Sequence, residues 1–273
     1  MRARGFSIPF RDDNMMDYEE IKFQTEDGIG FLTLSRPEKR NALSQNLMAE
    51  MIDLLKAIKS IQQVRAVILR SEGTVFSSGH DLSEMIEGDA VFYRRVFDAC
   101  TEMMEAIRGL PQPVIAQVQG LATAAGCQLV ATCDLAVASQ AARFATPGVR
   151  IGLFCHTPQV PLSRAIAPKK ALEMLLTGQP ISAQEAERLG LVNKVVPAEA
   201  LEEETLALAR HIAQASPLTL ALGKKSFYRQ IELDVRGAYD YAKEMMALNA
   251  LTEDAREGIS AFLNKRTPQW KGK

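Results

Sequence analysis

The chain has 273 residues, of which 47% are hydrophobic and 24% charged, and this composition argues against a disordered, collagen-like or membrane protein. A single α/β unit of this length would bury most of its apolar surface. The net charge is −1 and there is one Trp, so we expect no general electrostatic attraction to nucleic acid and no stacking platform for bases.

The sequence contains four cysteines: Cys100, Cys127, Cys133 and Cys155. They form no C-x-x-C pair, and the three histidines do not fall at zinc spacing around them. We therefore expect no metal site, and buried or half-buried thiols in a reducing compartment. Cys155 beside His156 is the one pair that we keep as a candidate for chemistry.

No apolar run reaches the length of a transmembrane helix, so we expect no membrane insertion. The N-terminus, Met1–Phe10, lacks the hydrophobic core of a secretory signal. It fits the frayed start of a cytoplasmic protein, an organelle-targeting remnant, or sequence upstream of Met15 or Met16. The expected location is cytoplasmic, or the mitochondrial matrix if the source is eukaryotic.

The first predicted element is a β-hairpin over Ile21–Ser35, because apolar and polar residues alternate there around Glu26-Asp27-Gly28. Arg36–Asn41 interrupts the alternation and is expected to be a loop. Ser44 is then expected to cap a helix with one buried face. Apolar residues follow it at helical spacing: Leu47, Met51, Leu54, Leu55 and Ile58.

The middle of the chain alternates strand and helix patterns, which predicts a mixed α/β core. The strands are expected at Val64–Leu69, Thr74–Phe76, Pro113–Val118 and Leu135–Ala138. The helices are expected at Ala90–Arg108 and Cys127–Cys133, the second preceded by a flexible run of small residues at Gly120–Gly126. The order strand, strand, helix recurs without a close sequence repeat.

From Pro168 onward the pattern is almost wholly helical, and only Val192–Val196 is expected to be extended. The predicted helices are Lys169–Leu176, Ala183–Leu189, Ala198–Ala213, Leu218–Ile231 and Val235–Leu263. The last two carry more apolar residues than one modest core needs, which predicts a face between subunits. A helical C-terminal region is therefore expected to follow the α/β core.

Gly120–Gly126 has a composition that suits a ligand site, because small residues let a ligand approach the backbone closely. The segment opens a helix, whose first N–H groups are unpaired and lie at the positive end of the helix dipole. Such a position can bind a developing oxyanion, but a tight turn packed on a neighbour explains the same residues. Ser77–Leu82 is a second polar loop after a strand, where functional residues are common.

Together these segments resemble the crotonase (enoyl-CoA hydratase/isomerase) superfamily, from about Tyr18 to Trp270, and the match is specific in order and spacing. The stretches that carry it are Arg36–Leu43, Phe76–Leu82, Gly120–Leu129, Cys133–Ala138, Phe144–Pro147, Thr177–Ala183, Gly190–Asn193 and Glu257–Arg266. Within the superfamily, the sequence most resembles one group, through Ser77–Leu82, Leu121–Leu129 and Gly152–Cys155.

The resemblance implies an α/β fold in which strand-strand-helix turns form a spiral over residues 18–197. Residues 198–273 are implied to form a helical region that makes a homotrimer, often paired into a homohexamer, and covers the CoA site. The implied ligand is an acyl-CoA thioester of fatty-acid metabolism. Coenzyme A would be part of the substrate, and no separate cofactor is expected.

The resemblance also assigns site positions. The backbone N–H groups of His80 and Ala125 are implied to polarise the thioester carbonyl in an oxyanion hole. The positions that match the lining of the CoA site are Lys39, Arg40, Ala42, Ser78, Asp81 and Leu82. Phe262 and Lys265 match positions that reach the CoA of a neighbouring subunit, and a phosphate contact suits a lysine.

Both catalytic glutamates of the family's hydratases are absent, since Gln128 stands at the first position and Gly148 at the second. Adding water to a double bond needs a base for the water and an acid for the α-carbon, and neither residue supplies one. Efficient hydration is therefore not expected. His156, eight residues beyond Gly148, is a candidate acid or base, with a histidine held by local hydrogen bonds as the alternative.

Three functions remain open on the sequence. The first is an acyl-CoA enzyme of the hydratase/isomerase type that combines the oxyanion hole with unusual acid–base chemistry. The second is an acyl-CoA-binding or regulatory protein that has kept the fold and lost turnover. The third is a slow hydratase in which Gln128 holds a poorly activated water. Binding of an acyl-CoA is common to all three.

Overall fold

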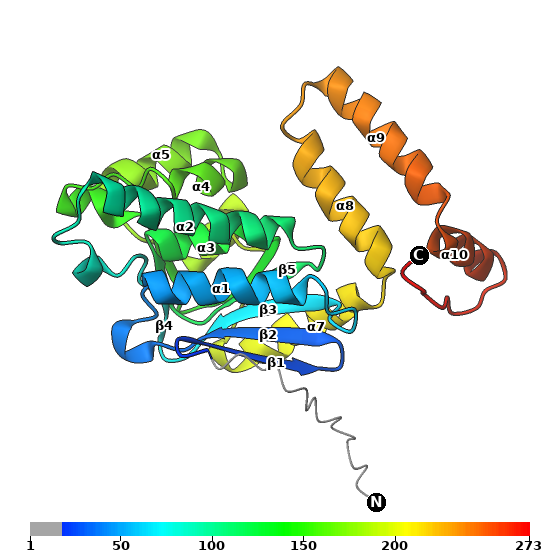
Figure 1. Ribbon diagram of the computed structural model, residues 1–273, viewed down its shortest axis with the longest axis horizontal. Coiled ribbons are helices and arrows are strands. Elements are labelled where there is room, and N and C mark those ends of the chain that lie inside the picture. The colour runs from blue at the N-terminus through cyan, green and yellow to red at the C-terminus, as the bar shows by residue number, and fades with distance from the viewer. Residues whose placement is uncertain (1–17) are drawn as a thin grey trace, which may run out of the picture.

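The computed structural model describes residues 18–273, so the expectations for Met1–Phe10 lie outside the described residues. A six-stranded sheet has the order β1-β2-β3-β5-β7-β10 (Figure 1). Its strands are Ile21–Glu26, Ile29–Leu34, Ala66–Ser71, Val114–Val118, Leu135–Ser139 and Lys194–Val196. All its neighbouring strands are parallel except β1 and β2, which form the predicted hairpin.

A smaller sheet has the order β4-β6-β8-β9, with strands at Val75–Ser77, Leu121–Thr123, Arg143–Ala145 and Ile181–Ser182. Three times the chain passes from a strand of the large sheet to a strand of the small one, as β3–β4, β5–β6 and β7–β8. Helices follow each pair, which confirms the expected strand-strand-helix spiral.

Between residues 18 and 273 the chain contains ten α-helices. They are α1 Gln45–Ile58, α2 Ala90–Gly109, α3 Ala125–Thr132, α4 Gln159–Ala165, α5 Pro168–Thr177, α6 Ala183–Leu189, α7 Leu201–Ala213, α8 Pro217–Gln230, α9 Val235–Ala250 and α10 Glu253–Leu263. Ser44 caps α1 as predicted, its hydroxyl accepting a hydrogen bond from the Leu47 N–H.

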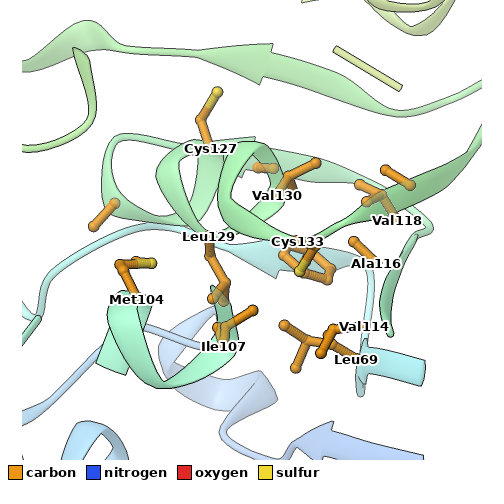
Figure 2. Packing of buried hydrophobic residues seen from close by; sticks show 14 of the residues in the cluster. Leu69, Met104, Ile107, Val114, Ala116, Val118, Cys127, Leu129, Val130 and Cys133 are labelled. Carbon is orange, nitrogen blue, oxygen red and sulfur yellow. The ribbon is translucent and has the colours of Figure 1, made fainter. Parts of the chain in front are cut away.

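The core lies on both faces of the six-stranded sheet, because successive side chains of a strand point to opposite sides. Val67 and Leu69 of β3 belong to the larger cluster, which α1, α2 and α3 cover; Figure 2 shows Leu69 with side chains of α2 and α3. Ala66 and Ile68 face the other way, toward α7. The predicted domain boundary after residue 197 thus assigns α7 to the helical C-terminal region, although α7 packs on the sheet.

The structure differs from the sequence predictions in several places. Gly120–Gly126 is not a simple flexible run, because it contains β6, and α3 begins at Ala125 rather than Cys127. Val235–Leu263 is two helices, since the Thr252 hydroxyl accepts from the Ala255 N–H and starts α10. Strands β8 and β9 and helix α4 had no predicted counterpart. Over residues 18–273, no helix has the length and apolarity needed to cross a membrane.

Helices α8, α9 and α10 project beside the core (Figure 1). A buried ion pair holds α8 to it, with Lys224 Nζ 2.6 Å from a carboxylate oxygen of Asp134. The Lys224 ammonium also donates to the Ile107 and Gln112 carbonyls, and the Tyr228 hydroxyl donates to Asp134 at 2.8 Å. Every polar group of this cluster is therefore hydrogen-bonded, as a buried charge requires.

Candidate active site

The site begins where the start of α3 meets the end of β4. A Cβ added to Gly126 would lie 2.3 Å from the Ser77 carbonyl oxygen, so only glycine allows the two backbones to approach this closely. Ser77 is itself fixed, because its hydroxyl donates to the Asn41 carbonyl at 2.8 Å. The contact brings the unpaired N–H groups of the helix start against the loop that follows β4.

Gly79 occupies the centre of this junction. Its φ is +87°, and a Cβ there would lie 2.8 Å from the Ala124 Cβ and 3.0 Å from the Ala125 nitrogen. Ala124, the residue before α3, has a φ of +52°, which is uncommon for a residue with a side chain and marks a constrained backbone. The missing Cβ of Gly79 thus leaves open the space in front of the Ala125 N–H.

Two backbone donors flank Gly79 without partners. The neighbouring peptide groups are paired, since the Leu43 N–H donates to the Gly79 carbonyl and the Asp81 N–H to the Leu43 carbonyl. Within the part of the chain that the structure describes, the N–H groups of His80 and Ala125 make no hydrogen bond. Two free donors beside the positive end of a helix can hold an oxygen that gains negative charge.

The His80 side chain packs edge-on against Phe97 of α2, with 5.6 Å between the ring centroids. Both ring nitrogens are buried, and neither has a hydrogen-bond partner among residues 18–273. Burial lowers the pKa of this imidazole to about 4, while the nearby Leu43 carbonyl opposes the shift. The ring is therefore neutral at physiological pH.

Gln128, on the second turn of α3, is buried beside α2. Its Oε1 lies 4.0 Å from the sulfur of Cys100, and burial raises the pKa of this thiol to about 12. Phe97 and Cys100 are three residues apart on α2, so they share one face of that helix. His80 and Gln128 consequently pack on the same apolar face of α2, and neither carries a charge there.

Gly148 is closed off by the loop that follows it. A Cβ at this position would lie 2.4 Å from the Leu153 carbonyl oxygen and 2.9 Å from the Cys155 sulfur. The Leu153 N–H donates to the Gly148 carbonyl at 2.9 Å, which holds the loop in place. A glutamate could enter only if this loop moved, so the absence of an acid here is built into the backbone.

Cys155 and His156 point in different directions. Cys155 is buried against Gly148, and burial raises the pKa of its thiol. His156 is exposed, and its ring lies 5.0 Å from that of Phe154. In the described part of the chain, no hydrogen bond or ring contact joins His156 to Gln128 or to Gly148 itself.

Arg36 organises the loop before α1, and sequence reasoning missed its role. Its guanidinium pairs with Glu20 at 2.8 Å and with Asp81 at 3.2 Å, and it donates to the Ala42 carbonyl at 2.9 Å. Asp81 also accepts hydrogen bonds from Ser83, which lower its pKa. The only sequence signal was the Arg-Pro start of the loop; its partners come from two other segments.

The predicted CoA positions divide into two groups. Lys39, Arg40, Ala42, Ser78, Asp81 and Leu82 lie together, since the Ser78 N–H donates to the Arg40 carbonyl and Arg36 joins Ala42 to Asp81. Phe262 and Lys265 lie elsewhere, at the end of α10, which packs on α8 and α9 (Figure 1). One chain therefore does not bring these two residues to the site.

Arg40 and Lys265 share an unusual backbone. Their φ angles are +54° and +51°, in the left-handed region that glycine adopts most easily. Both side chains are exposed, and neither forms an ion pair within residues 18–273. In that range no group of His, Cys, Asp and Glu is arranged to hold a metal ion.

The spiral of parallel strands is the fold of a crotonase-type protein, and solved enoyl-CoA hydratase structures match it. The family model "Enoyl-CoA hydratase/isomerase" matches residues 24–273. The chain belongs to the enoyl-CoA hydratase/isomerase family.

Similar proteins come from the group that the three sequence stretches resembled. "Enoyl-CoA hydratase domain-containing protein 3, mitochondrial" of Mus musculus is 51% identical over 247 residues, covering 90% of this chain and 82% of that protein. The crystal structure of human enoyl-CoA hydratase domain-containing protein 3 has a TM-score of 0.90 at 48% identity, covering 92% of this chain and all of that one. An enoyl-CoA hydratase structure from Mycobacterium smegmatis has the same TM-score and identity, covering 92% and 99%.

The depressed pKa of His80 predicts how stability depends on pH. In the unfolded chain a histidine takes up its proton near pH 6.5, whereas the folded protein binds it only near pH 4. The unfolded state therefore binds more protons between these values, and stability falls as the pH drops through this window, by about 2–3 kcal/mol. Urea unfolding at about pH 7 and about pH 4.5 measures the loss.

The variant His80→Phe should lose less stability over the same pH interval, because it lacks the buried imidazole but keeps every carboxylate of the unmodified protein. His211→Phe, at an exposed position of α7, is the matched control and should behave as the unmodified protein. An identical pH dependence in all three proteins would contradict a neutral, buried His80.

Proposed function

We propose that this chain binds acyl-CoA thioesters and polarises their carbonyl group with the backbone N–H groups of His80 and Ala125. The observation that carries the proposal is the pair of unpartnered donors on either side of Gly79. A thioester carbonyl oxygen gains charge when an enolate forms, and preorganised N–H groups in a site with little water stabilise that charge.

The coenzyme A part of the ligand suits the exposed loop beside these donors. Its phosphates need cations, and Lys39 and Arg40 are exposed there without ion-pair partners in the described chain. Arg40 keeps a side chain at a backbone position where glycine costs less, which supports a role for its charge. Ala42, Ser78, Asp81 and Leu82 would line the same site, and no separate cofactor is required.

The chemistry after binding is limited by what lies at the two acid positions. The carboxamide of Gln128 can hold a water molecule but cannot accept its proton near neutral pH. Gly148 has no side chain, and the Leu153 carbonyl fills the space where one would begin. We therefore propose that hydration of trans-2-enoyl-CoA is slow, since each missing acid or base typically contributes ~10²–10⁴-fold.

A binding or regulatory protein without turnover is the second candidate. The blocked position at Gly148 favours it, because the loop from Gly152 to Cys155 would have to move before any acid could act there. His156 remains a candidate acid or base only if the site is completed in a way that brings this exposed ring to the ligand.

Binding is tested by the thermal midpoint and by isothermal titration calorimetry with butyryl-CoA. We expect the midpoint to rise with ligand concentration, because the thioester binds only the folded state. Arg40→Gly should weaken binding about threefold to tenfold without lowering stability, since glycine suits the left-handed backbone and only the charge is lost. No shift with short, medium or long acyl-CoA at millimolar concentration would reject the proposal.

Turnover is tested by following the loss of the enoyl thioester absorbance of crotonyl-CoA. The unmodified protein should be slow or inactive, and Gln128→Glu should raise the rate by at least about tenfold by restoring one carboxylate. Gln140→Glu, an exposed glutamine outside the site, should change nothing. Rapid hydration by the unmodified protein would mean that its acid and base lie elsewhere.

A homotrimer, paired or not into a homohexamer, is proposed from the surface of the projecting helices. Neither α8 nor α9 has a buried residue, yet they and α10 expose large apolar side chains. Among them are Phe227, Ile231, Val235, Tyr239, Met246, Leu251 and Phe262. A neighbouring subunit would cover this surface and would bring Phe262 and Lys265 to its CoA.

Light scattering at micromolar concentration should therefore give a mass of three or six chains. Met246→Glu, which places a charge on the exposed face of α9, should shift the protein toward smaller species. Arg236→Glu changes a highly exposed residue at the start of the same helix and is the control. A monomeric mass for the unmodified protein would refute the assembly.

A further inference from the structure

Asn41 is fully buried in the loop before α1, and it is not among the residues proposed to touch the ligand. Its Oδ1 accepts a hydrogen bond from the Arg36 N–H at 3.0 Å, and its Nδ2 donates to the Glu72 and Val75 carbonyls at 2.8 and 2.7 Å. A carboxamide supplies both the acceptor and the two donors, which a carboxylate or a hydroxyl cannot do. The φ of Asn41 is +50°, a backbone that asparagine adopts more readily than most residues.

The two carbonyls that Asn41 binds lie at the turn from β3 into β4, and this turn is itself held in place. Gln119 Nε2 donates to the Ser71 carbonyl at 3.2 Å and to the Gly73 carbonyl at 3.0 Å. Gly73 has a φ of +77°, and a Cβ there would lie 2.9 Å from the Cβ of Pro37, so the turn packs directly on the loop before α1. The carboxamide of Asn41 therefore ties that loop to a turn that Gln119 already fixes.

After Asn41 the chain runs alongside the loop that follows β4, and backbone hydrogen bonds join the two segments. Leu43 and His80 form a parallel β-bridge, in which the Leu43 N–H donates to the Gly79 carbonyl at 2.7 Å. The Gly79 carbonyl and the His80 N–H belong to one planar trans peptide group, so they point in opposite directions. The hydrogen bond from Leu43 consequently determines where the His80 N–H points.

We propose that Asn41 is a positioning residue that aims the backbone N–H of His80 at the thioester oxygen. Its carboxamide holds the loop before α1, this loop carries Leu43, and Leu43 orients the peptide group that contains the His80 nitrogen. The inference rests on the proposed function, because it takes the His80 N–H to be one of the two donors to the acyl carbonyl.

A purely structural role for Asn41 would change different quantities. If its hydrogen bonds only stabilised the fold, their loss would lower the free energy of unfolding and leave a bound carbonyl as polarised as before. If Asn41 aims the donor, the hydrogen bond to the carbonyl becomes longer or more bent, and such bonds weaken steeply as they depart from linearity. The stretching frequency of the bound carbonyl distinguishes the two roles, because a hydrogen bond weakens the C=O bond and lowers its frequency.

The test is infrared difference spectroscopy with butyryl-CoA that carries an isotope-labelled carbonyl, at a concentration that saturates each protein. Binding to the unmodified protein should lower the carbonyl frequency. Asn41→Asp keeps the size of the side chain and removes its two donors, so the frequency should fall less and binding should weaken about threefold to tenfold, the ratio for one impaired hydrogen bond. Asn41→Gly keeps the left-handed backbone without the carboxamide and should act in the same direction, which provides a second variant if the aspartate does not fold.

Two controls account for charge and for stability. Asn46→Asp adds the same charge at an exposed position of α1. Ile68→Ala removes packing from the cluster on the α7 side of the sheet and lowers stability away from the site. Both variants should leave the frequency of the bound carbonyl as it is in the unmodified protein.

The outcomes separate this inference from the proposed function. If the unmodified protein does not bind butyryl-CoA, or binds it without lowering the carbonyl frequency, the proposed function fails. If the unmodified protein lowers the frequency and the Asn41 variants lower it equally, the proposed function stands and the positioning role is refuted. A reduced effect in Ile68→Ala as well would assign the change to lost stability and would also refute the positioning role.

Amide hydrogen exchange of the unmodified protein without ligand provides a measurement that needs no variant. The Leu43 N–H should be protected, because it is bonded to the Gly79 carbonyl before any ligand arrives. Exchange of this N–H at the rate of an open loop would show that the peptide group of His80 is not held in advance, and would contradict the inference.

Discussion

The approach of Gly126 to the Ser77 carbonyl is the constraint on which the rest of the site depends. It places the start of α3 against the loop after β4, so that donors separated by more than forty positions in the sequence lie on either side of Gly79. Any side chain at Gly126 would push the helix away and separate the two N–H groups. The strained backbone at Ala124 is retained within this contact, because the Ala124 N–H is bound to the Ala145 carbonyl of β8.

Three independent features leave the described residues around the free N–H groups uncharged. Burial keeps His80 neutral and the Cys100 thiol protonated. Gln128 carries an amide, and Gly148 carries nothing, with the Leu153 carbonyl in the vacant space. The charged groups lie at the rim instead, in Arg36 and its two carboxylates, where they fix the loops rather than face the acyl chain.

Helices α1 and α2 and the candidate site at the start of α3 were predictable from the sequence, because apolar periodicity and a run of small residues are local signals. The failures have physical causes. Strand β6 has only three residues, and it pairs with β4 and β8, which come from distant parts of the sequence. The break between α9 and α10 depends on a single side-chain cap by Thr252. The role of Arg36 depends on its partners Glu20 and Asp81, and the closure at Gly148 depends on the Leu153 carbonyl. Neither contact can be predicted from the residue types in the sequence.

The buried pair of Lys224 and Asp134 constrains how the chain can diverge. Helices α8 and α9 place no residue in the core, so most of their positions can change without disturbing it. Lys224 and Asp134 are different, because loss of either one leaves the other as a largely buried charge without its counter-ion. The two positions, ninety residues apart, should therefore change together or not at all, and coupled substitution at this pair should mark relatives in which the projecting helices meet the core in another way.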